Sequence, residues 1–290
     1  MSILRLRGRE FRPGEFAIMA VVNRTPDSFF DRGRTYGFAA ALDAVDAAVA
    51  GGADIVDIGG VKAGPGDEVD PAEEIRRVAG LVAAVRERHP DLIISVDTWR
   101  AEVGEVVARA GADLLNDTWG GVDPGLAGVA AEHGIGLVCA HAGRAVPRTR
   151  PHRVAYDDVV ADVIGYTVEL AERAAAAGVA RESILIDPAH DFGKNTWHSL
   201  EVGRRLHEMV GTGWPVLVAV SNKDFVGETL GGLPVEQRHA GTLATLAVSA
   251  WQGARVFRVH DAASARAALS AVTALRERPG SPYGAWESAG

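Results

Sequence analysis

The stretch LIISVDT at residues 92–98 is apolar, rich in β-branched side chains, and ends on the polar pair Asp97 and Thr98. Seven more short runs of this kind occur along the chain, and most of them also end on a polar residue: 17–23, 54–60, 114–119, 135–141, 184–191, 215–223 and 254–261. Such runs are typical of parallel strands that are buried on both faces of a sheet. The sequence therefore predicts eight parallel strands.

Helical patterns separate these runs, and a glycine stands between helix and next strand in phrases such as AGGAD and ARAGAD. The expected helices lie at 38–50, 71–85, 101–110, 124–133, 157–177, 200–209, 234–251 and 262–276. This alternation predicts an α/β fold with right-handed crossovers. Eight repeats favour a single (β/α)8 TIM barrel, with its active site at the C-terminal ends of the strands, over an open doubly wound sheet.

The barrel is expected to span residues 17–278 as one domain, because no linker or change of composition divides the chain. The N-terminal segment 1–16 is expected to form the barrel floor. The C-terminal tail 279–290 is expected to be disordered. A chain of 290 residues with 47% hydrophobic content is the size of one such barrel.

Composition narrows the functional classes. The net charge of −8, without a basic stripe, argues against nucleic acid as a partner. Cys139 is the single cysteine, so no intramolecular disulfide forms and a reducing cytoplasm is the expected location. Neither a signal-peptide core nor an apolar run of membrane-spanning length is seen, so no membrane association is expected.

Three polar residues stand at the ends of predicted strands and suggest a binding site. Asp97, Asn116 and Asp187 would form an acceptor-rich wall at one barrel mouth. A planar heterocycle with adjacent N–H and NH₂ groups, such as a pterin or a guanine, would satisfy that wall. Each residue alone could equally be a helix cap, but three together favour binding.

Cationic residues gather at the last two predicted strands. Lys223 follows Ser221 just past the seventh strand, and Arg258 and His260 are two apart on the eighth, so their side chains point to one face. This placement suits a phosphate or diphosphate. The structural alternative pairs Arg258 with Asp261 or Asp187 as an internal ion pair.

Two further side chains complete the expected site. Asn23 ends the first strand, where its carbonyl suits Mg²⁺ held jointly with a phosphate, although it could instead close a turn. Phe192 offers an aromatic wall beside a glycine. Ser221 has no evident histidine and aspartate to activate it, so covalent catalysis is not expected.

Taken together, residues 17–261 resemble the dihydropteroate synthase family. The matching phrases, in family order, are VVNRTPDSFFD, DIGG with PG, SVDT, NDTWGG, DPAHDFGK, the serine and lysine of SNK, and RVHD. The resemblance implies a TIM barrel, a homodimer and a transferase of folate biosynthesis. In this family, 6-hydroxymethyl-7,8-dihydropterin diphosphate condenses with p-aminobenzoate, and diphosphate leaves.

The resemblance also implies roles for individual residues. Asp97, Asp187 and Lys223 would be catalytic; the pterin would be bound by these three together with Asn116 and Phe192. Mg²⁺ would be held by Asn23, the diphosphate by Asn23, Arg258 and His260, and the second substrate by Ser221, with Lys62 as a weaker candidate.

The sequence departs from the family at the second-substrate half. Val61, Lys62, Ala63 and Gly64 stand where the family has Glu-Ser-Thr-Arg, and Asn222 replaces an arginine. Two lost charge-assisted hydrogen bonds, at about 1.5–3 kcal/mol each, would reduce binding or rate by about 10²–10⁴. The alternatives are therefore a working synthase, a diverged paralogue that keeps a pterin-like pocket, a methyltetrahydrofolate-type methyltransferase barrel, and a non-catalytic ligand sensor.

Overall fold

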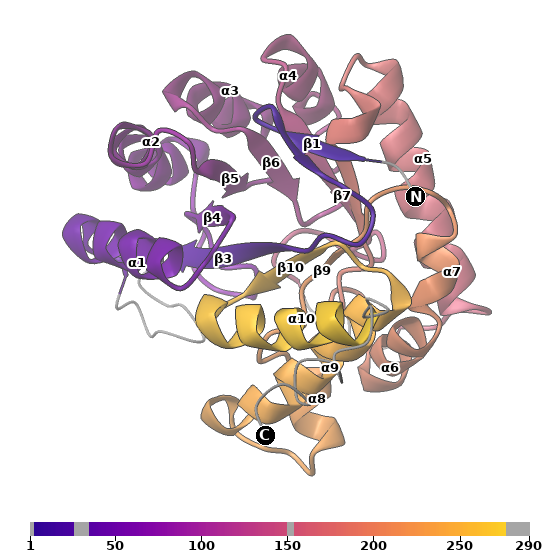
Figure 1. The fold of residues 1–290 in the computed structure, drawn as a ribbon. Helices are drawn as coiled ribbons and strands as arrows, with labels where there is room; N and C mark the ends of the chain where they lie inside the picture. Colours follow the sequence, from indigo (N-terminus) through magenta and orange to yellow (C-terminus); the bar gives the residue numbers. More distant parts are fainter. Residues whose placement is uncertain (1–2, 26–34, 150–153, 277–290) are drawn as a thin grey trace, which may run out of the picture.

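The computed structural model describes residues 3–25, 35–149 and 154–276. Within these ranges, eight parallel strands form one sheet in the order β8-β7-β6-β5-β4-β3-β10-β9. The two edge strands meet through a parallel bridge between Ile186 and Val216, so the sheet is nearly closed. Helices surround it (Figure 1), which confirms the predicted (β/α)8 barrel. The predicted tail 279–290 lies outside the described residues.

The strands of the barrel are short and almost wholly buried. Their bounds are β3 Ala17–Asn23, β4 Ile55–Gly59, β5 Ile93–Asp97, β6 Leu114–Asp117, β7 Gly136–Ala140, β8 Ile184–Asp187, β9 Leu217–Val218 and β10 Val256–Val259. All eight fall inside the predicted runs. The largest difference is at residues 215–223, where only two residues are strand, because the chain turns early toward the site.

The helices alternate with the strands as expected. Their bounds are α1 Phe38–Ala50, α2 Pro71–Arg88, α3 Ala101–Ala110, α4 Leu126–Glu132, α5 Val159–Ala176, α6 Thr196–Arg204, α7 Leu206–Val210, α8 Asp224–Thr229, α9 His239–Gln252 and α10 Ala262–Arg276, with 3₁₀ turns at Arg181–Ser183 and Val235–Gln237. Capping residues determine where several of these helices begin or end. Asp70 caps α2 by accepting from the Glu73 N–H, and Gly111 ends α3 in the left-handed region.

Two predicted helices are wrong in detail. The single helix expected at 200–209 is two helices, α6 and α7, which meet at Arg205 because its backbone (φ −107°, ψ 20°) leaves the helical region. The helix expected at 234–251 begins as a 3₁₀ turn and becomes α-helical at His239. The short helix α8 after β9 has no counterpart in the prediction.

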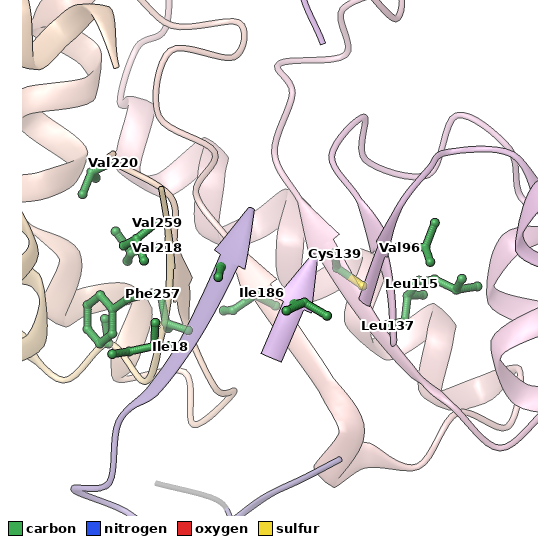
Figure 2. Close-up of a cluster of buried hydrophobic side chains, with 14 of the residues drawn as sticks. Ile18, Val96, Leu115, Leu137, Cys139, Ile186, Val218, Val220, Phe257 and Val259 are labelled. Atoms are coloured by element: carbon green, nitrogen blue, oxygen red, sulfur yellow. The ribbon is translucent and has the colours of Figure 1, made fainter. Parts of the chain in front are cut away.

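Alternate residues of the strands face two separate cores. The outer core lies between the sheet and the helices, and Figure 2 shows part of it, including Ile18, Leu115, Ile186 and Phe257. The inner core fills the barrel with side chains of opposite parity, such as Met19. This alternation leaves the C-terminal strand ends available for polar groups.

A short antiparallel hairpin packs against the inner core. Its strands are β1 Leu4–Leu6 and β2 Arg9–Phe11, and Leu4, Leu6 and Phe11 join the cluster formed by the inward-facing residues of the barrel. Neither strand was expected from the sequence. In the described ranges, no helix is both long and apolar enough to cross a membrane.

Candidate functional site

A cavity of about 420 Å³ opens at the C-terminal ends of the strands. Eight of the ten site residues expected from the sequence line it: Asn23, Lys62, Asp97, Phe192, Ser221, Lys223, Arg258 and His260. The other two, Asn116 and Asp187, lie at the ends of β6 and β8, where they are buried with 1% and 2% solvent exposure. The barrel therefore brings together residues from all parts of the chain.

Arg258 lies at the centre of the site, between two carboxylates. Its Nε donates to Asp57 Oδ2 at 2.6 Å, and its Nη2 donates to Asp97 Oδ2 at 2.9 Å. The alternative partners considered for Arg258, Asp261 and Asp187, do not form these ion pairs. Strand β10 pairs with β3, and β3 pairs with β4, so Arg258 reaches across the barrel interior to β4 and β5.

Asp57 is a site residue that sequence reasoning missed. It is fully buried on β4 and accepts from Ser95 Oγ at 2.6 Å and from Asn116 Nδ2 at 3.1 Å, in addition to Arg258. Its only sequence signal is a charge in the middle of the apolar strand IVDIG. Asp57 therefore orients both the amide of Asn116 and the guanidinium of Arg258.

The amide of Asn116 has one unused acceptor. With Nδ2 bound to Asp57, its Oδ1 has no hydrogen-bond partner among the described residues. A buried polar atom of this kind costs free energy unless a ligand or water satisfies it. This Oδ1 is the clearest local indication that the site accepts a hydrogen-bond donor.

Asp97 is held from two sides. Thr118 Oγ1 donates to its Oδ1, and Arg258 donates to its Oδ2. Burial raises the pKa of Asp97 to about 7, and Asp57 and Glu74 act in the same direction, while Arg258 and Thr118 oppose the rise. Asp97 is therefore expected to titrate near neutral pH.

This titration gives a pH prediction. If the ligand's N–H groups bind the ionised form of Asp97, the affinity for 6-hydroxymethyl-7,8-dihydropterin should rise about tenfold between pH 6 and pH 8, because about a tenth of Asp97 is ionised one unit below its pKa. Fluorescence titration across this range measures it. The Asp97→Asn variant should lose this rise in affinity between pH 6 and pH 8. An equally steep profile in Asp97→Asn would contradict the assignment.

Asp187 ends β8 next to two lysines. Its Oδ1 accepts from the Ala189 N–H at 2.7 Å. Burial raises the pKa of Asp187, and the charges of Lys223, Lys194 and Arg258 lower it. The net effect is a pKa of Asp187 above its ordinary value, with the three neighbouring cations limiting the rise that burial causes.

Lys223 and Phe192 form one wall of the cavity. Lys223 Nζ lies 4.8 Å from the centroid of the Phe192 ring and donates to the His190 carbonyl. Trp119 meets Phe192 edge to face at 5.3 Å and meets Trp99 at 6.4 Å. This cluster gives a flat ligand an aromatic surface beside a cation.

Lys194, a second residue that sequence reasoning missed, holds the loop after β8. Its buried Nζ contacts His141 Nδ1 at 2.7 Å and donates to the carbonyls of His141, Phe192 and Ala189 at 2.9, 3.0 and 3.3 Å. Burial and the charge of Lys223 lower the pKa of Lys194 to about 7. Because Lys194 and Lys223 together bind the carbonyls of Ala189, His190 and Phe192, they fix the position of the Phe192 backbone.

Ser221 and His260 form a pair that corrects one expectation. Ser221 Oγ lies 2.9 Å from His260 Nδ1, although no histidine partner was expected for this serine. The two residues are 39 positions apart, but they follow β9 and β10, which pair in parallel. The backbone N–H of His260 also donates to Ser221 Oγ at 3.3 Å, and the serine O–H stays available to donate to His260 Nδ1.

Asn23 lines the cavity at the end of β3, next to Gly59. A Cβ at Gly59 would come within 3.0 Å of Asn23 Oδ1 and 3.7 Å of Asp97 Cβ, so the glycine lets these side chains approach. No group of three histidine, cysteine, aspartate or glutamate residues suited to a metal exists in the described ranges. One amide oxygen fits Mg²⁺ only together with phosphate oxygens and water.

The departures from the family pattern at Val61–Gly64 and Asn222 fall at the cavity. Lys62, Ala63 and Gly64 line it after β4, and Val61 beside them is buried. Asn222 also lines the cavity, and its Oδ1 accepts a hydrogen bond from Thr242 Oγ1 at 3.3 Å. None of these residues presents a guanidinium to the cavity.

Comparison with known proteins gives a consistent result. A family model described as pterin binding enzyme matches residues 19–260. The inactive dihydropteroate synthase 2 of Mycobacterium tuberculosis H37Rv is 57% identical over 275 residues, covering 93% of this chain and 86% of that protein. The dihydropteroate synthase of Escherichia coli K12 is 37% identical over 258 residues, covering 89% and 90%.

Solved structures agree with these sequence matches. Yersinia pestis dihydropteroate synthase in a sulfonamide complex superposes with a TM-score of 0.89 at 36% identity, covering 95% of this chain and 99% of that one. The Xanthomonas albilineans dihydropteroate synthase in complex with 7,8-dihydropteroate gives a TM-score of 0.83 at 34% identity, covering 96% and 100%.

Proposed function

Because the chain belongs to the pterin-binding family of dihydropteroate synthases, we propose that its cavity binds 6-hydroxymethyl-7,8-dihydropterin diphosphate and transfers the pterin only weakly to p-aminobenzoate. The family is one of transferases. The proposal concerns how far this chain keeps the chemistry of its relatives.

The observation that carries the proposal is the set of acceptors beneath the cavity. Asp97, Asn116 and Asp187 converge there from β5, β6 and β8, and Asn116 Oδ1 has no partner among the described residues. The ring N–H and exocyclic NH₂ of a pterin are donors of matching type. Phe192, with Lys223 beside it, supplies the surface on which the flat ring would lie.

The diphosphate would lie toward Asn23, Arg258 and His260. Arg258 Nη1 makes no protein hydrogen bond in the described ranges, whereas its Nε and Nη2 bind Asp57 and Asp97. This nitrogen is thus a donor for an anion. Mg²⁺, which would neutralise charge on the departing diphosphate, would be held by Asn23 together with that diphosphate.

The residues suggest how transfer would be assisted. As the carbon–oxygen bond to diphosphate lengthens, positive charge develops on the pterin, and the carboxylates of Asp97 and Asp187 stabilise it. Arg258 and His260 would stabilise the opposite charge on the leaving group. Asp57 acts indirectly, because it fixes the orientation of Arg258 and Asn116.

The second-substrate half supports only weak synthase activity. Gly64 and Asn222 replace two arginines of the family pattern, and the amide of Asn222 is bound to Thr242. A non-catalytic pterin-binding protein is the second candidate, because four relatives with 54–57% identity are named inactive dihydropteroate synthase 2. Both candidates keep the same pterin site.

A restoration experiment separates these candidates. Replacing Val61–Gly64 by Glu-Ser-Thr-Arg together with Asn222→Arg should raise the rate of dihydropteroate formation at least tenfold. The two restored arginines should regain part of the ~3–6 kcal/mol of binding free energy that their charge-assisted hydrogen bonds contribute. The assay contains pterin diphosphate, p-aminobenzoate and Mg²⁺. Ile3→Arg, at a side chain with 40% exposure beside the N-terminal hairpin and away from the cavity, controls for added charge. Flat activity after restoration would overturn the synthase proposal in favour of the non-catalytic candidate.

We also propose a homodimer, as the family resemblance implies, in the cytoplasm expected from the single cysteine Cys139. The packed helices α9 and α10 expose three large apolar side chains, Val248, Trp251 and Leu275, at 56%, 58% and 75%. A group of exposed apolar residues on adjacent helices is suited to subunit contact.

A further inference from the structure

The loops after β4, β8 and β9 form one wall of the cavity, made by Val61, Lys62, Ala63, Gly64, Asp191, Asn222 and Asp224. We call it the loop wall. From the charges fixed on it, we propose that the second ligand of this site is an aromatic amine without a carboxylate, neutral or cationic. This inference rests on the proposed function, since it concerns the ligand that would lie beside a bound pterin diphosphate.

Asp191 is the first fixed charge on the loop wall. Its Oδ1 accepts from Ser199 Oγ at 3.2 Å, and its Oδ2 accepts from the Phe225 N–H at 3.3 Å. The residue has φ 69°, a left-handed conformation that glycine adopts more easily. The carboxylate is therefore anchored at the cavity and does not swing away from a ligand.

Asp224 is the second fixed charge. It is the first residue of α8, lines the cavity, and pairs with Arg238 at 2.9 Å. Arg238 also donates to the carbonyls of Asn222 and Leu233, so its guanidinium is held behind the wall. Arg238 is thus not among the residues that line the cavity.

Two of the described cations that line the cavity are committed to protein acceptors. Arg258 binds Asp57 and Asp97, and Lys194 binds three carbonyls and His141. Lys223 donates to the His190 carbonyl, faces Phe192, and its charge interacts with that of Asp191. Lys62 is the cation that the loop wall itself contributes, and a lysine lacks the bidentate fork with which arginine binds carboxylates.

An anionic ligand would therefore meet the fixed carboxylates of Asp191 and Asp224 on the loop wall, with Lys62 on that wall and Lys223 beside Asp191 as the nearby cations. Like charges placed close together oppose binding, whereas a neutral or cationic amine avoids this repulsion. The transfer itself is unchanged in kind. The amine nitrogen forms a bond to the pterin methylene carbon, the carbon–oxygen bond to diphosphate breaks with its electron pair on the diphosphate, and the amine proton passes to solvent.

Binding to the pterin-loaded protein tests the inference with three matched amines. The protein is saturated with pterin diphosphate and Mg²⁺, and p-aminobenzoate, p-aminobenzamide and 4-aminobenzylamine are titrated by calorimetry at 4 °C to limit turnover. We expect the amide and the benzylamine to bind at least tenfold more tightly than the benzoate. Equal or tighter benzoate binding, or no binding of any amine, would overturn the inference.

Variants locate the origin of the preference. Asp191→Gly suits the left-handed backbone and removes the charge, and Asp191→Asn removes the charge alone. In both variants, the ratio of the affinity for the amide or the benzylamine to the affinity for the benzoate should fall at least threefold. Asp46→Asn, on the outer surface of α1, is the matched control and should leave the ratio unchanged. An unchanged ratio in both Asp191 variants would overturn the inference. Failure of pterin diphosphate itself to bind would instead overturn the proposed function.

Discussion

The Asp187→Asn variant is expected to bind 6-hydroxymethyl-7,8-dihydropterin diphosphate about 10²–10⁴ times more weakly than the wild type. A carboxylate that accepts two charge-assisted hydrogen bonds from a pterin contributes about 3–6 kcal/mol, at about 1.5–3 kcal/mol each. Asparagine keeps the shape but offers one acceptor and no charge. It also leaves Lys223 and Lys194 without the carboxylate that favours their charged forms.

Calorimetric titration in the presence of Mg²⁺ measures the loss. Asp46→Asn is again the control, because its carboxylate binds Arg88 and His89 on the outer surface. Unfolding curves of both variants show whether the fold is kept. A reduction of less than threefold in a folded Asp187→Asn protein would remove Asp187 from the pterin site.

The Arg258→Met variant is expected to lose about 3–5 kcal/mol of unfolding free energy at pH 8, because it leaves buried carboxylates without their cation. Asp57 is fully buried and Asp97 nearly so, and both depend on Arg258 for an ion pair. Urea unfolding, followed by fluorescence, measures the change. The double variant Arg258→Met with Asp57→Asn should regain part of the loss, since one unpaired charge is removed.

The deficit of Arg258→Met should shrink as the pH falls. The pKa of Asp97 is already raised to about 7 with Arg258 present, and removing the cation raises it further. When a carboxyl has a higher pKa in the folded state than in the unfolded state, the free energy of unfolding rises as the pH falls from the folded pKa toward the unfolded value near 4. Arg205→Met, which breaks exposed ion pairs, should change stability little. A deficit independent of pH would contradict this role for Asp97.

The barrel was predictable because its signals are local. Buried parallel strands require apolar β-branched runs such as LIISVDT, and glycine marks the helix ends at Gly111 and Gly253. The strand ends and the loops that follow them also bring eight of the ten expected site residues to one cavity. Helix boundaries near Arg205 were missed because a single residue's backbone decides them.

The contacts inside the site could not be predicted because they depend on barrel closure. Arg258 meets Asp57 and Asp97 from 201 and 161 residues away, and Lys194 meets His141 from 53 residues away. No local pattern encodes such pairs. Asp57 carried a usable signal, because a charge within a buried strand requires a partner.

One measurement tests the central claim, that the inner half of the cavity is a pterin site. Wild-type protein is titrated with 6-hydroxymethyl-7,8-dihydropterin diphosphate and Mg²⁺ in a calorimeter, alongside Asp187→Asn. The account predicts saturable binding at one site per chain in the wild type, reduced at least a hundredfold in the variant. Absence of binding to the folded wild-type protein would contradict it.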